Sequence, residues 1–155
     1  MRHKYIKHIN PAWKEKLNFT IEANIDPDIS QTQIGHEQLF CRQISDYIFE
    51  VCCIPFFIYN ISLGDEVKTD SNYSVIEVTK KSGHFTFRVW FGDSKSTTIR
   101  DDVIEKAKEL LCPFEWYSCN LMAIDAPTDG FAKKISNYLQ EKEDSGLLTY
   151  ETGRI

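Results

Sequence analysis

The segment Ser82-Gly83-His84 carries the residue types that come closest to catalytic chemistry. A serine becomes a nucleophile when a base lies within hydrogen-bond reach, and histidine often supplies that base. Here the two side chains flank a glycine at an expected hairpin turn, where they rarely converge, so the pattern favours a structural or binding role. Asp65, in a Leu-Gly-Asp turn, is the carboxylate that would orient His84, although capping of its own turn explains it more simply. If the protein is an enzyme, its candidate catalytic residues are His84, Asp65 and Ser82.

The five cysteines do not follow a pattern typical of metal or redox chemistry. Their number is odd, and they lack the C-x-x-C spacing and the nearby histidines of a zinc site. The glycines do not gather as a phosphate-binding loop. We therefore expect no metal and no cofactor, and we expect free structural thiols in a reducing cytoplasm. These cysteines are Cys41, Cys52, Cys53, Cys112 and Cys119.

Acidic side chains recur in the C-terminal part of the chain, whose net charge is -5. A negative charge opposes binding to a phosphate backbone, so we expect no nucleic-acid partner. Such residues commonly form a solvated face, but together they can also attract a basic protein. The basic N-terminus lacks the features of a secretory signal, and no apolar run is long enough to span a membrane. The candidate partner-binding residues are Asp101, Asp102, Glu105, Glu141, Glu143, Asp144 and Glu151.

Residues 18–91 are expected to form the β-rich half of the fold. Apolar and polar residues alternate over 18–25, and similar strand patterns follow after an expected loop at 26–35. The segment 78–91 closes this half as a hairpin, with Phe85, Phe87, Val89 and Phe91 on one face. Short strands joined by tight turns predict an antiparallel meander or a small barrel. The other expected strands cover residues 37–44, 47–54, 66–70 and 73–80.

Residues 85–155 are expected to form a β-α-β-α-β layer of the ferredoxin-like type. A helix over 96–111 carries an apolar stripe that includes Leu110 and Leu111, and a second helix begins near Thr128 or Asp129 and stops at Gly146. A single strand is expected at 114–125 and a closing strand at 147–151. Right-handed crossovers place both helices on one face of the sheet. The fold class is therefore α+β, in one compact domain over residues 1–155.

The first 17 residues are expected to be an N-terminal extension to this domain. Lysine and histidine residues are interleaved there with Tyr5, Ile6, Ile9 and Trp13. Two alternatives remain open for this segment, a short helix that docks on the body and a partly ordered arm.

Several short motifs occur in an order and with gaps that resemble a known bacterial family. They read LFCR, IPFFIYNISLGDEV, KKSGHFTFRV, AIDAP and GLLTYETG, and they cover roughly Glu37 to Gly153. This arrangement is similar to that of domain of unknown function 4265. The chain departs from the family where SGHST is more usual, because Phe85 follows His84. The resemblance implies a compact cytoplasmic domain, and it supplies no catalytic residues because the family has no established reaction.

Three functional hypotheses follow from these observations. The leading one is an immunity-type inhibitor, which binds and neutralises a basic toxin domain such as a nuclease through its acidic face, as in contact-dependent growth inhibition. The alternative is a small enzyme or ligand sensor, with a pocket formed by the SGH hairpin, the LGD turn and the IPFF segment. RNA binding is the weakest possibility, since the chain is acidic and lacks the RNA-recognition signature.

Overall fold

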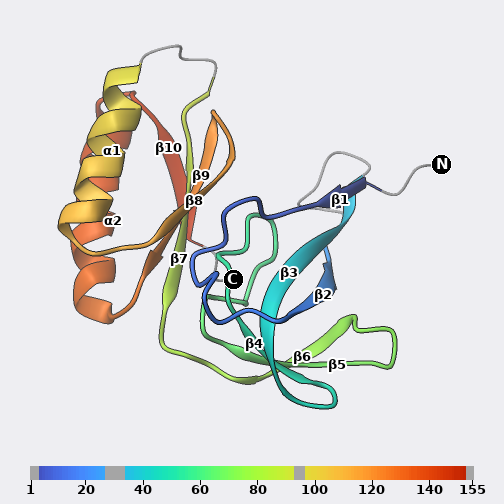
Figure 1. Cartoon of the computed structure of the whole chain (residues 1–155). Coiled ribbons are helices and arrows are strands. Elements are labelled where there is room, and N and C mark those ends of the chain that lie inside the picture. Colours follow the sequence, from blue (N-terminus) through green and yellow to red (C-terminus); the bar gives the residue numbers. More distant parts are fainter. Residues whose placement is uncertain (1–3, 27–33, 93–96, 153–155) are drawn as a thin grey trace.

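The computed structural model describes residues 4–26, 34–92 and 97–152. The fold is α+β, with two mainly antiparallel sheets and two helices (Figure 1). The N-terminal sheet contains β1 (Lys4–Ile6), β2 (Phe19–Asn24), β3 (Ile34–Ser45), β4 (Ile48–Val51), β5 (Glu66–Thr69) and β6 (Val75–Lys80). The C-terminal layer contains β7 (Phe85–Trp90), α1 (Thr97–Glu109), β8 (Phe114–Ser118), β9 (Leu121–Ala126), α2 (Asp129–Asp144) and β10 (Thr149–Thr152).

The N-terminal sheet is organised around the long strand β3. This strand pairs antiparallel with β2 and β4 and parallel with β1, and β5 and β6 follow beyond β4. The alternation expected in β2 is observed, because Ile21 and Ala23 are buried while Thr20 and Asn24 are exposed. A bridge between Glu22 and Ser74 also brings β2 next to the start of β6.

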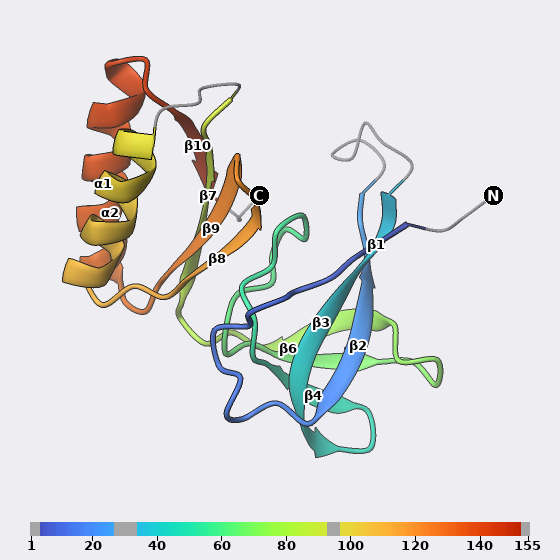
Figure 2. The ribbon, with the colours of Figure 1, turned by 45° about the horizontal axis from the view of Figure 1, so that its top comes forward.

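The C-terminal sheet has the strand order β10-β7-β9-β8, and every neighbouring pair is antiparallel. Both helices cover one face of this sheet, as Figures 1 and 2 show. Phe87 and Val89 belong to the core beneath the helices, as expected, and Phe85 packs against that core. Helix α2 begins after Thr128, whose hydroxyl accepts the N–H of Phe131, so its expected start is confirmed.

The single strand expected at 114–125 is wrong, because this segment forms a hairpin. Strand β8 ends at Ser118 and β9 begins at Leu121. The Ser118 hydroxyl accepts the N–H of Asn120 in the intervening turn. Apolar residues continue on both sides of that turn, which contains neither glycine nor proline, so the periodicity gives no sign of a break.

Leu111 does not join the buried stripe expected for the first helix. The helix ends at Glu109, and Leu110 is buried as expected. Leu111 has a φ of 56° and its side chain is 77% exposed. The left-handed backbone turns the chain away from the helix axis before Pro113, so the helical spacing no longer applies at this residue.

The hairpin expected at 78–91 is also wrong. Strand β6 pairs with β5, whereas β7 lies in the other sheet between β9 and β10. Residues 81–84 therefore connect the two sheets. Gly83 has a φ of 88°, so a positive φ is present here as expected, but it serves a crossing between sheets rather than a two-residue hairpin.

The N-terminal segment is part of the body of the fold. Neither a helix nor a loose arm describes its residues 4–17, since β1 pairs with β3 and the N–H of Trp13 donates to Cys52 O at 3.0 Å. His8 is only 3% exposed. Most of the loop expected at 26–35 lies outside the described residues.

The irregular segment 52–63 covers the second face of the C-terminal sheet. The Thr86 hydroxyl donates to Ser62 Oγ at 3.2 Å, and Ala123 of β9 belongs to the same core cluster as Ile54 and Phe56. The C-terminal sheet therefore lies between the helices on one side and this segment on the other.

Candidate functional site

His84 lies at the junction of the two sheets and is bound to Asp125. Its Nδ1 lies 2.7 Å from Asp125 Oδ2. Asp125 pairs with Thr86 in the β7–β9 register, which brings its side chain next to the residue that precedes β7. The His84 side chain is 18% exposed and that of Asp125 is fully buried. Asp125, rather than the expected Asp65, therefore orients the imidazole ring.

Asp65 instead ties its own turn to the connection between the sheets. Its carboxylate accepts the N–H of Ser62 at 2.9 Å and the N–H of Ser82 at 2.7 Å. The ammonium group of Lys81 lies 3.7 Å away. Capping of the Leu-Gly-Asp turn, which explained Asp65 more simply from the sequence, is thus observed. The SGH and LGD segments do meet, as the pocket hypothesis requires.

The Ser82 hydroxyl is committed to backbone groups. It donates to Leu63 O at 2.8 Å and accepts the N–H of His84 at 3.1 Å. Its proton therefore points to a carbonyl rather than to a histidine base. This geometry does not activate Ser82 as a nucleophile.

The electrostatics of the pair favour a protonated His84. The hydrogen bond that His84 donates to Asp125 raises the pKa of His84, and burial only partly opposes this increase. Burial raises the pKa of Asp125, and His84 lowers it. Because Nδ1 faces the carboxylate, Nε2 is the ring atom that can exchange a proton with solvent or a ligand. The rings of Trp13 and His84 lie at right angles to each other, with their centroids 5.8 Å apart.

A second histidine, His8, lies at the centre of a buried carboxylate network that sequence reasoning missed. Its Nδ1 lies 2.7 Å from Glu115 and its Nε2 lies 2.7 Å from Glu37. Both ring nitrogens face carboxylate oxygens, and a ring that carries hydrogen on both nitrogens donates to both. The same carboxylates accept backbone N–H groups of Ala12, Ile54, Phe56 and Phe57. The network thus joins the N-terminal segment, both sheets and segment 52–63.

The surroundings of His8 keep it charged. Burial lowers its pKa, but Cys53 and the hydrogen bonds to Glu115 and Glu37 raise it by more, so the pKa lies well above its ordinary value. The IPFF segment, expected to wall a pocket near His84, donates its N–H groups to this network instead. No sequence spacing links residues 8, 37 and 115, because they come from three distant elements.

The expected acidic surface divides between two faces of the molecule. Five of its carboxylates are exposed on the helices, namely Asp101, Asp102 and Glu105 of α1 and Glu141 and Asp144 of α2. Glu143 is half-buried and accepts the N–H of Tyr150 at 3.0 Å. Glu151 lies on β10 and accepts the Tyr59 hydroxyl at 2.6 Å, on the opposite side of the sheet. Glu151 is therefore separate from the helical group.

Tyr138 of α2 lies close to charged side chains of both helices. Burial raises its pKa, and Asp102 and Glu141 raise it further. The ammonium groups of Lys106 and Lys142 also lie over its ring, at 5.7 and 5.4 Å. The helix surface therefore carries carboxylates from both helices near the Tyr138 ring, over which two lysines lie.

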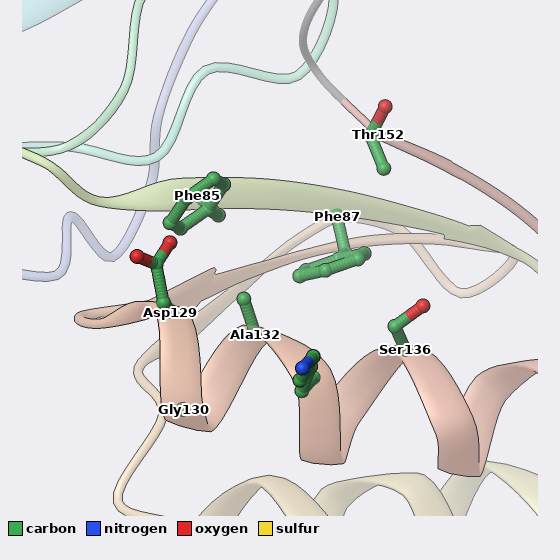
Figure 3. Close-up of a pocket in the computed structure, with 8 residues that line it drawn as sticks. Phe85, Phe87, Asp129, Gly130, Ala132, Ser136 and Thr152 are labelled. Atoms are coloured by element: carbon green, nitrogen blue, oxygen red, sulfur yellow. The ribbon is translucent and has the colours of Figure 1, made fainter.

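A groove of about 620 Å³ lies between β7 and the first turns of α2 (Figure 3). Phe85 and Phe87 form its apolar side and Ala132 faces them from the helix. Asp129 and Ser136 stand along the helical side. Phe85, the residue that follows His84, thus lines this groove.

Two kinds of feature are absent from the described residues 4–26, 34–92 and 97–152. Within these ranges, no group of three or more His, Cys, Asp or Glu side chains is arranged to hold a metal ion. In the same part of the chain, neither helix has the length and apolar character needed to cross a membrane.

The comparisons with known proteins bear on the fold and on the family. The chain is similar to a hypothetical protein from Neisseria gonorrhoeae, known from a crystal structure, with 20% identity and a TM-score of 0.70. The similarity covers 86% of this chain and 94% of that chain, and at this identity it shows the fold alone. No curated protein matches the sequence. The family model of Domain of unknown function (DUF4265) matches residues 37–150, so the resemblance seen in the sequence is confirmed and this chain belongs to the DUF4265 family.

Proposed function

We propose that this protein is a cytoplasmic immunity-type inhibitor, which binds and neutralises a basic toxin domain such as a nuclease. The observation that supports this function is the group of five exposed carboxylates on the outer helices. The proposal includes a protein partner and no nucleic acid, membrane or cofactor.

The placement of the helices suits such an interaction. Helices α1 and α2 lie side by side on the outer face of the C-terminal sheet, away from the N-terminal sheet (Figure 2). Asp102 and Glu141 act on the same residue, Tyr138, so carboxylates of both helices contribute to one local field. Such a field speeds encounter with a basic surface, and the aromatic ring offers a contact of the kind that anchors protein interfaces.

The binding experiment compares two doubly substituted proteins of equal net charge. Asp102→Lys with Glu105→Lys reverses two charges on α1. Asp46→Lys with Glu77→Lys reverses two exposed charges far from the helices, in the β3–β4 turn and on β6. The partners are the toxin domains encoded beside the gene, and association rates are measured at low and high salt. We expect the α1 variant alone to lose most of the salt-dependent rate. Equal rates for the two variants would exclude the helix surface.

A second candidate function is a small enzyme or a small-ligand sensor at His84. The favouring observation is the 2.7 Å contact between His84 Nδ1 and Asp125, which leaves Nε2 outside this hydrogen bond. In this case a small molecule protects the His84 ring resonances from solvent exchange and shifts the pKa of the ring. Asp125→Asn should abolish both effects while the folded spectrum persists. A ligand that acts equally on the Asp125→Asn protein would dismiss this site.

We also propose that the chain forms one domain with a more specific architecture. The order β10-β7-β9-β8, with one helix after β7 and one before β10, supports a ferredoxin-like layer. The successive antiparallel pairing from β2 to β6 and the Glu22–Ser74 bridge support a meander that closes partly into a small barrel. Thermal unfolding should then show one cooperative transition by both fluorescence and circular dichroism. Two separate transitions would contradict a single domain.

A further inference from the structure

A groove of about 450 Å³ lies between the N-terminal segment and the end of α1. Pro11, Pro113 and Phe114 give its wall an apolar part. Lys14 on one side and Lys108 on the other are the only charged side chains among the described residues that line it. The groove therefore combines apolar surface with positive charge, in a chain whose net charge is -5.

The charge of the two lysines is not used within the protein. Both side chains are exposed, and within the described part of the chain neither ammonium group forms an ion pair. Glu109, next to Lys108 in the sequence, pairs with Lys106 at 3.6 Å. Glu105 lies one turn before Lys108 on α1 and does not line the groove. An acidic group that enters the groove therefore meets two cations and no carboxylate in its wall.

Leu111 lines the same groove from a backbone position that disfavours leucine. The N–H of Cys112 donates to Ala107 O and that of Leu111 to Lys108 O, which is the hydrogen-bond pattern of a Schellman motif. In this motif Leu111 has a φ of 56°, where glycine is usual because a Cβ has a steric cost. Its side chain is 77% exposed, so it adds little to the core. Neither the backbone nor the core accounts for a leucine here, which directs attention to what its side chain offers a partner.

We propose that this groove binds an acidic peptide segment of a partner protein. Carboxylates of the peptide pair with Lys14 and Lys108, and an apolar side chain between them packs against Leu111. The charge of the wall favours this occupant over a basic or a neutral segment. The groove includes the N-terminal segment and lies at the end of α1, so this site is distinct from the carboxylates proposed to bind a toxin.

The test follows the backbone amides of the full-length protein by NMR while a peptide is added. The probe is EELLEE with blocked ends, and the matched control peptides are KKLLKK and EEAAEE. We expect saturable shifts in segments 10–14 and 108–114, with a dissociation constant for EELLEE below about 1 mM that rises with added salt. We expect EEAAEE to bind about tenfold more weakly and KKLLKK not to bind.

Three outcomes of this titration would overturn the proposal. Absence of shifts with EELLEE would exclude the site, and equal binding of KKLLKK would refute the role of charge. Vesicles of phosphatidylglycerol are added in a parallel experiment. Shifts in the same segments with vesicles but not with EELLEE would assign the groove to an anionic membrane surface instead of a peptide.

Substitutions in the wall test the two kinds of contact separately. Leu111→Gly removes the apolar side chain and relieves the positive φ, so a loss of binding cannot result from unfolding, and we expect about tenfold weaker binding of EELLEE. Lys14→Ala with Lys108→Ala should weaken binding about fivefold. The control, Lys68→Ala with Lys133→Ala, removes two exposed charges elsewhere and should change the affinity by less than about twofold. Unchanged affinity in Leu111→Gly, or equal effects of the two lysine pairs, would refute the placement of the peptide.

Discussion

Replacement of His8 by alanine should be among the most damaging single changes in this protein. The substitution removes a cation that bridges two buried carboxylates through contacts of 2.7 Å. Glu37 and Glu115 would then face each other without their shared positive charge. Removal of one partner from a buried ion pair typically costs about 3–5 kcal/mol, and the backbone N–H groups that both carboxylates retain place the expected loss near the lower value, about 3 kcal/mol.

Urea denaturation followed by tryptophan fluorescence measures this loss. Ile9→Ala is the matched control, because the neighbouring side chain is 90% exposed and its loss should change the free energy of unfolding by less than about 0.5 kcal/mol. For a chain of this length, a loss of about 3 kcal/mol lowers the melting temperature by roughly 6–12 °C. A loss below about 1 kcal/mol would show that the network does not hold the two sheets together.

The pH dependence gives an independent check on His8. Its pKa is raised in the folded protein, so its contribution is fully present below its unfolded pKa of about 6.5. That contribution is lost as the pH rises through the folded pKa. The free energy of unfolding should therefore fall on the alkaline side in the wild type, and this part of the slope should be absent in His8→Ala. The same alkaline slope in both proteins would refute the assignment of a cationic ring.

Three further predictions concern the junction of the sheets and the end of α1. Gly64→Ala should lower the free energy of unfolding by roughly 2 kcal/mol, because the residue has a φ of 85° and an added Cβ would lie 3.1 Å from Ser82. In the control Gly130→Ala, the added Cβ meets no atom closer than 3.8 Å, so the free energy of unfolding should change little. Asp125→Asn should lower the pKa of His84, measured by NMR, since the lost carboxylate raises it, and an unchanged pKa would contradict the pair. Leu111→Gly should stabilise the protein by roughly 1 kcal/mol in urea denaturation, because it relieves a positive φ at an exposed position.

The sequence predicted the elements whose signals are local. Alternating residues indicated β2, and Thr128 marked the start of α2 through its hydroxyl. Positive φ at Gly83 was also predictable, because only glycine adopts it without a steric cost. The partner strand of β7 was not predictable, because alternation shows which face of a strand is apolar but not which strand pairs with its edge. The hairpin prediction failed at this step.

The same distinction between local signals and tertiary pairing applies to the site residues. Contact between the SGH and LGD segments was a condition of the pocket hypothesis, and Asp65 does bind the N–H of Ser82. Asp125 was missed as the partner of His84 because it lies 41 residues away, and only the β7–β9 register brings it close. The buried network was missed for a similar reason, since Glu37 and Glu115 reach His8 from different sheets. Pairing of this kind depends on tertiary packing rather than on spacing.

A growth-protection assay tests the proposed function most directly. Each toxin domain encoded beside the gene is expressed in a sensitive cell together with the wild type, with the Asp102→Lys and Glu105→Lys variant, or with the Asp46→Lys and Glu77→Lys variant. We predict that the wild type and the second variant restore growth against one of these toxins and that the first variant does not. Failure of the wild type against every toxin, or equal protection by both variants, would contradict an immunity function carried by the acidic helices.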